Sequence, residues 1–173
     1  MNAWRRFLTL PALLPAVLLS LGACALPSTV TLYSGIIECP KVNEEALKMV
    51  NWTQVPEVNL RIRHDEFDPM VLRLRQGWPY VFRIRNRDDY VHTFRAHEFF
   101  SKVAVVEMTV GGRAREETCF AALRIPARQT VELRLIAVVD GFYEYEDTMM
   151  PLPFLFSSGT DGVIIIEERK ARI

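Results

Sequence analysis

Few side chains in this chain could do chemistry: among 173 residues there are three histidines and three cysteines. His92 follows a polar loop at 86–89 and shares a strand face with Phe94, because side chains two apart point the same way. His97 would face the opposite way unless the strand ends or bulges first, and we expect it at the surface. His64 is expected in a turn. Neither His97 nor His64 is predicted to take part in a site.

Motifs of the common hydrolases and phosphate-binding enzymes are missing from the sequence. It contains no H-E-x-x-H motif and no phosphate-binding loop, and Ser157-Ser158-Gly159 lacks the pattern of a nucleophile elbow. Glu144 and Glu146 would share a strand face and could act as an acid/base pair, but two solvated carboxylates are the default. We therefore expect the protein not to be an enzyme; a copper-dependent enzyme is the least favoured alternative.

The first 23 residues have the pattern of a secretory signal. A short basic start precedes an apolar run from Phe7 to Leu21, and Pro11 and Pro15 disfavour a stable spanning helix. The run ends in Leu21-Gly22-Ala23-Cys24, which looks like a bacterial lipobox and predicts cleavage before Cys24 and lipid on its thiol. The alternatives are an uncleaved anchor and an ordinary signal peptide.

A lipid on Cys24 would attach the protein to a membrane of the bacterial cell envelope, facing the periplasm. Ala25 follows the cysteine, and the outer membrane is favoured by analogy. Cys39 and Cys119 would then form a candidate disulfide in an oxidising compartment, closing a loop of about 80 residues. The alternative is two buried free thiols.

Three segments alternate apolar residues with arginine, at 58–63, 70–75 and 80–85. Period two with one apolar face predicts half-buried strands, the last two joined by a turn at Gln76-Gly77. The polar faces would carry Arg61, Arg63, Arg73, Arg75, Arg83 and Arg85. A solvated surface is the simpler interpretation; a local cationic patch for a partner or an anionic membrane is the alternative.

The rest of the chain predicts one short helix and further short strands. Asn43 is a good N-cap for a helix that begins at Glu44. Strands are expected at 30–37, 101–109, 120–125, 131–138, 142–145 and 163–166. About seven to eight short strands separated by turns predict an all-β sandwich.

Equal numbers of basic and acidic residues, 21 each, give no indication of nucleic-acid binding.

Two groups of residues resemble the cupredoxins, the small copper-protein β-sandwiches. The front group is Phe67-x-Pro69, Gly77, Asn86 and His92-x-Phe94. The second group is Ile125-Pro126, Val131-Glu132-Leu133, the stretch 141–145 and the stretch 159–164. The resemblance spans residues 58–167 and implies a Greek-key sandwich. We expect a signal peptide at 1–23, a lipid-anchored tether with the short helix at 24–52, and a cupredoxin-like domain at 53–173.

The resemblance also implies where copper would bind. In the family, the histidine of the H-x-F step is the first copper ligand, which corresponds to His92. The family cysteine falls on Asp147, the second histidine near Met150 or Leu152, and the axial methionine on Thr160. A blue-copper site needs a thiolate and two imidazoles, so blue-copper electron transfer is not expected here.

Two interpretations of the remaining residues stay open. In one, the site binds copper in a non-blue form: His92 joins Met149 or Met150, and Glu146 or Asp147 adds an oxygen ligand. Thioether and imidazole suit Cu(I), whereas carboxylate and imidazole suit Cu(II). In the other, the domain is a metal-free binding or assembly module of the envelope, and an apolar loop at 149–156 packs on the fold or on a partner protein.

Overall fold

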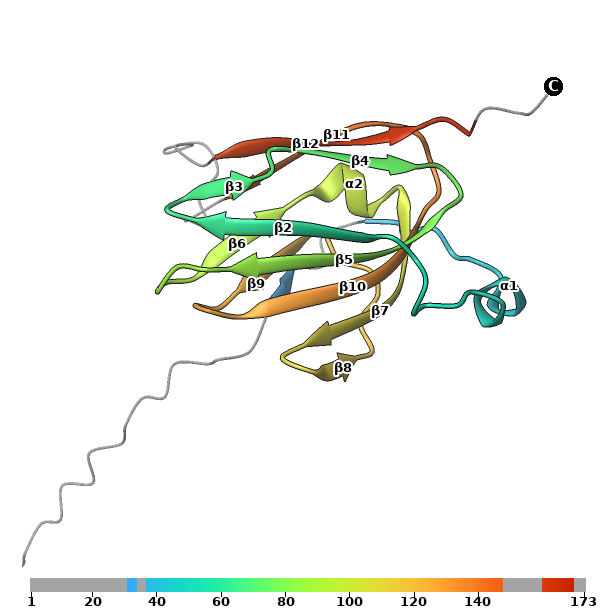
Figure 1. The fold of residues 1–173 in the computed structure, drawn as a ribbon, viewed down its shortest axis with the longest axis horizontal. Helices are drawn as coiled ribbons and strands as arrows, with labels where there is room; N and C mark the ends of the chain where they lie inside the picture. Colours follow the sequence, from blue (N-terminus) through green and yellow to red (C-terminus); the bar gives the residue numbers. More distant parts are fainter. Residues whose placement is uncertain (1–30, 34–36, 148–159, 170–173) are drawn as a thin grey trace, which may run out of the picture.

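Two six-stranded sheets pack face to face in the part of the chain that the structure, a computed structural model, describes: residues 31–33, 37–147 and 160–169 (Figure 1). The first sheet has the order β1 (Thr31–Tyr33), β9 (Ala122–Ile125), β6 (His92–Arg95), β11 (Gly141–Asp147), β12 (Asp161–Glu167) and β4 (Val71–Arg75). The second has the order β3 (Glu66–Asp68), β2 (Glu57–Arg63), β5 (Pro79–Asn86), β10 (Thr130–Ala137), β7 (Val103–Val110) and β8 (Arg113–Arg115).

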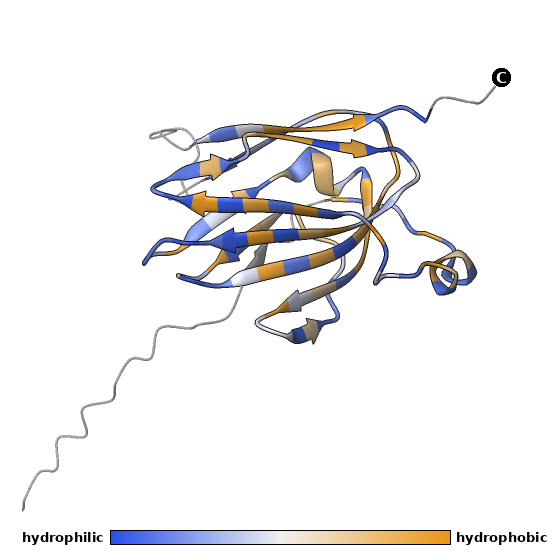
Figure 2. Cartoon of the chain, viewed as in Figure 1, coloured by the Kyte–Doolittle hydropathy of each residue, from blue (hydrophilic) through white to orange (hydrophobic). Residues whose placement is uncertain are grey.

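The alternation in the sequence becomes the alternation between core and surface. Along β10, every second residue from Val131 to Ala137 is buried, and Figure 2 shows the same change of hydropathy along β2, β5 and β10. Facing apolar residues of the two sheets form one core. At its centre, edge-on aromatic contacts join the sheets: the ring centroids of Phe67 and Tyr145 lie 4.8 Å apart, and those of Phe82 and Phe94 6.1 Å apart.

Two short helices lie outside the sheets in the described residues. The predicted helix is present as α1 (Glu44–Lys48), and the Asn43 side chain accepts a hydrogen bond of 2.9 Å from the backbone N–H of Glu45, as an N-cap does. The second helix, α2 (His97–Phe100), begins two residues after β6 ends and buries Phe99 and Phe100. No helix in the described residues is long and apolar enough to cross a membrane.

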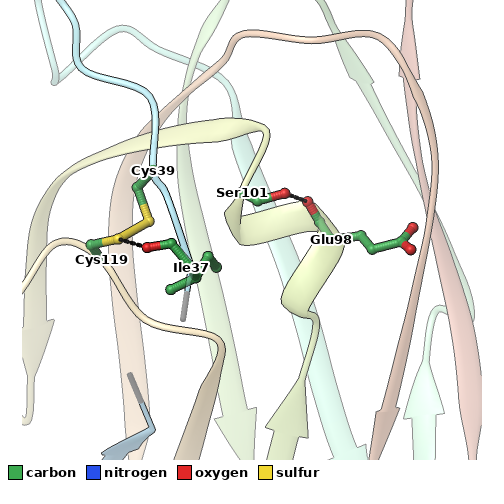
Figure 3. The surroundings of a disulfide bond; sticks show 5 residues. All are labelled: Ile37, Cys39, Glu98, Ser101 and Cys119. Carbon is green, nitrogen blue, oxygen red and sulfur yellow. Dashed lines mark hydrogen bonds between the residues drawn. A yellow bond between two sulfur atoms is a disulfide. The ribbon is translucent and has the colours of Figure 1, made fainter. Parts of the chain in front are cut away.

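Cys39 and Cys119 are joined by a disulfide, with their Cα atoms 5.7 Å apart (Figure 3). The Sγ of Cys119 also lies 3.7 Å from the carbonyl oxygen of Ile37; an oxidised sulfur has no proton to donate, so this is a polar contact only. The bond closes 80 residues of sequence and ties the segment before α1 to the segment before β9.

The structure corrects the predicted number of strands and determines how they pair. Twelve strands are present in the described residues instead of seven to eight. Among those not predicted, β3 and β8 are only three residues long and too short for a periodic pattern. The strands on either side of Gln76-Gly77 do not pair with each other: β4 pairs with β12 in one sheet, and β5 pairs with β2 and β10 in the other.

This arrangement divides the six arginines that the sequence places on polar faces. Arg73 and Arg75 lie on the outer face of the first sheet, and the other four lie on the outer face of the second. Three of them pair with carboxylates of neighbouring strands: Arg61 with Asp68, Arg73 with Glu167, and Arg83 with both Glu57 and Glu132. One continuous patch of all six arginines is therefore ruled out.

Candidate functional site

His92 is the first residue of β6, and its side chain points into the sandwich together with that of Phe94. The imidazole is completely buried (0% exposed). This direction is the one that period two predicts, because His92 and Phe94 are two residues apart on one strand. A buried imidazole must have hydrogen-bond partners for its ring nitrogens.

The partner of Nδ1 is Asp147, the last residue of the neighbouring strand β11. Antiparallel pairing sets Asp147 opposite Phe94, and the same alternation that buries Tyr143 and Tyr145 turns Asp147 inward. Its Oδ2 is in direct contact with Nδ1 of His92. Its Oδ1 accepts a hydrogen bond of 2.9 Å from the backbone N–H of Thr93. Both carboxylate oxygens therefore have partners on β6.

The partner of Nε2 is Asp88, in the loop that connects β5 to β6. Oδ2 of Asp88 lies 2.9 Å from Nε2 of His92. The same carboxylate accepts hydrogen bonds from the backbone N–H groups of His64, at 2.9 Å, and Asp65, at 3.4 Å. Asp88 thus connects the buried imidazole to the turn between β2 and β3. His92, Asp88 and Asp147 are called the ion cluster below.

Asn86 fixes the loop that carries Asp88. Its Oδ1 accepts a hydrogen bond of 2.8 Å from the backbone N–H of Asp88. Its Nδ2 donates to the carbonyl oxygens of Tyr90, at 2.7 Å, and of Ile125 and Pro126, both at 3.1 Å. Asn86 is fully buried. The loop position of Asp88 is therefore determined by side-chain bonds from within the domain.

The electrostatics of the ion cluster favour a charged imidazole. Burial lowers the pKa of His92, but the hydrogen bonds and charges of Asp147 and Asp88 outweigh burial and leave the pKa raised. Burial raises the pKa of Asp88, but hydrogen bonds from His64, Asp65 and His92 outweigh it and leave this pKa lowered. An imidazolium donates from both ring nitrogens, which matches a carboxylate oxygen at each of them.

Tyr90 and Asp65 cover the outer side of the ion cluster. The ring of Tyr90 lies 4.9 Å from the ring of His92 between centroids, and its hydroxyl donates a hydrogen bond of 2.7 Å to Oδ1 of Asp65. That hydrogen bond to a carboxylate raises the pKa of Tyr90 to about 12. The hydroxyl of Thr160 donates to the backbone carbonyl of Asp65. In the described residues, no buried side-chain nitrogen or oxygen lacks a hydrogen-bond partner.

A blue-copper centre does not fit these residues. The position that the sequence resemblance assigns to the family thiolate holds Asp147, and the two cysteines among the described residues are bonded to each other, so neither offers a thiolate. A metal ion would also need a lone pair on Nδ1 and a place about 2 Å from both nitrogen and oxygen ligands. The direct contact between Nδ1 of His92 and Asp147 occupies that place.

One group of residues in the described structure could nevertheless supply ligands to a metal ion. One ligand atom each from Asp65, His92 and Asp147 lies within 4.8 Å of the others. Asp88 binds Nε2 of His92, and a carboxylate in that position is common behind metal-binding histidines. Asp65, however, is exposed and already accepts the hydroxyl of Tyr90.

Of the ligand residues suggested by the sequence, the described structure brings together only His92 and Asp147. Glu146 lies on the outer face of β11 and pairs with Arg95 at 3.3 Å, so it points away from His92. Met149 and Met150 lie outside the described residues, as does Cys24. His97 is exposed on α2, and His64 is exposed in the turn after β2, as predicted.

Sequence analysis missed three residues of this site: Asp88, Asp65 and Tyr90. All three stand in polar turns, where acidic and aromatic residues are expected at the surface. The sequence nevertheless contained one signal for Asp88, because Asn-x-Asp is a spacing at which an asparagine side chain can bond the backbone two residues on. Nothing in the sequence placed that turn against His92.

Of the comparisons with known proteins, only the one with solved structures finds a likeness, and this likeness concerns the fold. No protein-family model matches the chain, and no curated protein matches it. Among solved structures, a multi-copper oxidase from Pediococcus acidilactici aligns over 80% of this chain and 30% of its own, at 16% identity and a TM-score of 0.51. A multicopper oxidase from Campylobacter jejuni aligns over 65% of this chain and 30% of its own, at 12% identity and a TM-score of 0.45.

Auracyanin A, described as a "blue" copper protein from Chloroflexus aurantiacus, aligns over 64% of this chain and 98% of its own, at 17% identity and a TM-score of 0.40. The chain thus spans 30% of the length of the two oxidases and nearly all of auracyanin A. The domain is an all-β, cupredoxin-like sandwich. At these identities the likeness concerns the fold and carries no information about the site.

Proposed function

We propose that this protein is a metal-free, cupredoxin-like binding or assembly module of the bacterial cell envelope, in which the ion cluster takes the place of a copper centre. One observation carries the proposal: both ring nitrogens of the buried His92 are bonded to carboxylates, Asp147 at Nδ1 and Asp88 at Nε2. An imidazolium that donates to both carboxylates has no lone pair free for a metal ion.

The ion cluster then has a structural role. It connects β6, β11, the loop after β5 and the turn after β2, and its buried polar groups all have hydrogen-bond partners. Fully satisfied polar networks fix one arrangement of the elements that they join. The end of the sandwich that binds metal in blue-copper proteins would serve here as a rigid support for the surrounding loops.

The envelope location rests on two features. The sequence at 21–24 looks like a lipobox, which would place a lipid on Cys24 and hold the domain at a membrane, by analogy the outer one, facing the periplasm. A disulfide between Cys39 and Cys119 suits an oxidising compartment and is rare in the cytosol. We propose that the binding partner is a protein or a ligand of the envelope. We propose neither an enzymatic activity nor a nucleic-acid partner.

Copper binding at a non-blue site is the second candidate function. It is favoured by the grouping of Asp65, His92 and Asp147, whose ligand atoms lie within 4.8 Å of one another. Met149 or Met150 would add a thioether for Cu(I). For copper to bind, Nδ1 of His92 would have to lose its proton and separate from Asp147.

Copper retention discriminates the two candidates. The protein is purified without an affinity-tag metal. It is equilibrated with Cu(II) or, under conditions that keep the disulfide intact, with Cu(I), and is then dialysed against metal-free buffer. The variants are His92→Ala and the double change Met149→Leu, Met150→Leu; His97→Ala, which removes an exposed histidine, is the control. We expect no retained copper that depends on His92. About one retained copper per chain, lost in His92→Ala and kept in His97→Ala, would establish the second candidate instead.

A further inference from the structure

The outer face of the second sheet carries its charges in two separate zones. In the central zone two arginines are neutralised by strand neighbours: Arg83 pairs with Glu132 at 2.8 Å and also with Glu57, and Arg134 pairs with Glu107 at 2.8 Å. Such alternating pairs are typical of a solvated sheet surface. Arg85, exposed on β5, takes part in no ion pair within the described residues.

The second zone is a concavity of about 630 Å³ at the end of the sheet toward which β2 and β5 run (Figure 1). Its lining includes four arginines against two carboxylates: Arg61, Arg63, Arg87, Arg128, Glu66 and Asp68. Arg61 pairs with Asp68, and Arg128 pairs at 2.8 Å with Asp89 at the edge. Within the described residues, Arg63 and Arg87 take part in no ion pair. We call this zone the arginine concavity.

The backbone around the arginine concavity is fixed from inside the domain. The N–H of Arg87 donates to the carbonyl oxygen of Ile62 at 2.8 Å, and the N–H of Arg128 donates to that of Asp88 at 3.2 Å. The N–H groups of His64 and Asp65 donate to the Asp88 side chain. The arginine concavity and the ion cluster therefore share Asp88.

Strained backbone gathers at the same place. His64, Asp65 and Arg128 have φ angles of 54°, 61° and 62°, and they are the non-glycine residues with positive φ in the described chain. Left-handed conformations of such residues are unfavourable and tend to occur at functional sites. Here these residues belong to two turns that are hydrogen-bonded to Asp88. The turn with His64 and Asp65 donates to its side chain, and the turn with Arg128 donates to its backbone carbonyl.

We infer that the arginine concavity binds a phosphate-bearing ligand, with Arg63 and Arg87 as its main contacts. A guanidinium presents a planar fork of donors that matches phosphate oxygens two at a time. Two guanidinium groups without an ion pair, those of Arg63 and Arg87, line one concavity whose backbone is held by hydrogen bonds, which favours a negatively charged ligand over a neutral one. The inference rests on the proposed binding role of the domain but not on the metal state of the ion cluster.

The ligand phosphate could be free or part of a lipid headgroup, and two soluble probes separate these sources. Inorganic pyrophosphate represents a free phosphate, and the deacylated headgroup of phosphatidylglycerol represents a lipid. Calorimetric titration of the full chain in neutral detergent measures both, at low and at moderate salt. The test variant is Arg63→Gln with Arg87→Gln. The control is Arg73→Gln with Arg95→Gln, which removes two cations from the outer face of the other sheet.

We expect one or both probes to bind, at least tenfold more weakly to the test variant and within twofold of wild type to the control. Pyrophosphate binding with this pattern indicates a free phosphate, and headgroup binding alone indicates a lipid. Failure of both probes to bind, or equal weakening in both variants, would overturn the inference. Should the test variant not fold, the side-chain N–H resonances of Arg63 and Arg87 in the wild type provide the result: they must shift on addition of the probe, and unchanged resonances would contradict it.

Discussion

Nδ1 of His92 is in direct contact with Oδ2 of Asp147, a bond between the first residue of β6 and the last residue of β11. It follows from strand register, because pairing of Asp147 with Phe94 brings the carboxylate beside the imidazole two residues earlier. The resemblance to cupredoxins puts the family thiolate at this same position. In this structure the position holds a carboxylate that is bonded to the histidine.

Removing one side of this pair should destabilise the fold strongly. Asp147→Ala leaves a buried imidazolium with one partner fewer, and breaking a buried pair typically costs about 3–5 kcal/mol. Glu146→Ala removes the neighbouring exposed carboxylate, whose pair with Arg95 should contribute about 1 kcal/mol or less. Urea unfolding of both variants measures the difference. Equal losses of unfolding free energy would contradict a buried ion pair at His92.

The contribution of the ion cluster to stability should depend on pH in a defined window. The pKa of His92 is raised above its ordinary 6.5, so its stabilisation is complete below pH 6.5 and is lost as pH rises through the higher folded pKa. The pKa of Asp88 is lowered below its ordinary 3.8, so its stabilisation is present above pH 3.8 and is lost as pH falls through the lower folded pKa.

The largest contribution therefore lies between pH 3.8 and 6.5. Urea unfolding of the wild type and of His92→Ala across pH 3 to about 9 gives the difference in unfolding free energy. We expect this difference to be greatest in the window and to shrink above it. A difference that grows as pH rises above 7 would mean that the folded protein holds a neutral His92.

The sequence was sufficient to predict the β-sandwich and to predict that the side chains of His92 and Phe94 share one strand face. Period two correctly turned His92 and Phe94 inward, and the N-cap at Asn43 located α1. Strand pairing was not predictable from the same pattern. The turn at Gln76-Gly77 joins β4 and β5 along the chain, yet parallel partners far away in the sequence, β12 and β2, determine which sheet each strand enters.

The site was predictable only in part, for a related reason. His92 was found because it lies on a strand with period two and matches the H-x-F step of the cupredoxins. Asp147 was found only through that resemblance, since the strand predicted at 142–145 ended before it. Asp88 was missed because the direction of its side chain depends on hydrogen bonds that the sequence does not reveal. One joins its backbone N–H to Asn86, and the others join its carboxylate to the turn at 64–65, which is 23 or more residues away in the sequence. A turn residue has no periodicity that would distinguish a buried carboxylate from a solvated one.

The disulfide gives a third prediction. Intact mass without reductant should be two hydrogens below the reduced value, and the native protein should not alkylate at Cys39 or Cys119. A loop of 80 residues gives an upper value of roughly 4.5 kcal/mol for stabilisation in the chain-entropy model. The Cys39→Ala, Cys119→Ala variant should therefore unfold at a lower urea concentration. Ready alkylation of both thiols in native protein would exclude the bond.

Anchoring by lipid is tested at Cys24. Because lipid attaches to the thiol before the signal peptide is removed, Cys24→Ala should abolish labelling by a fatty acid and leave an unprocessed precursor. Cys119→Ala is the control, since it also removes one cysteine but should be labelled normally. Normal processing of Cys24→Ala, with recovery in the membrane fraction, would reject the lipoprotein prediction.

The central claim is that His92 is a buried imidazolium held by two carboxylates and not a metal ligand. Nitrogen-15 NMR of the histidine rings tests it most directly, because a protonated and a lone-pair nitrogen have widely separated shifts. At pH 6 we expect both ring nitrogens of His92 to carry protons and to stay unchanged on addition of one equivalent of Zn(II) or Cu(I). His64 and His97, both exposed, provide the internal reference. An unprotonated Nδ1, or loss of the Nδ1 proton when the metal is added, would contradict the account.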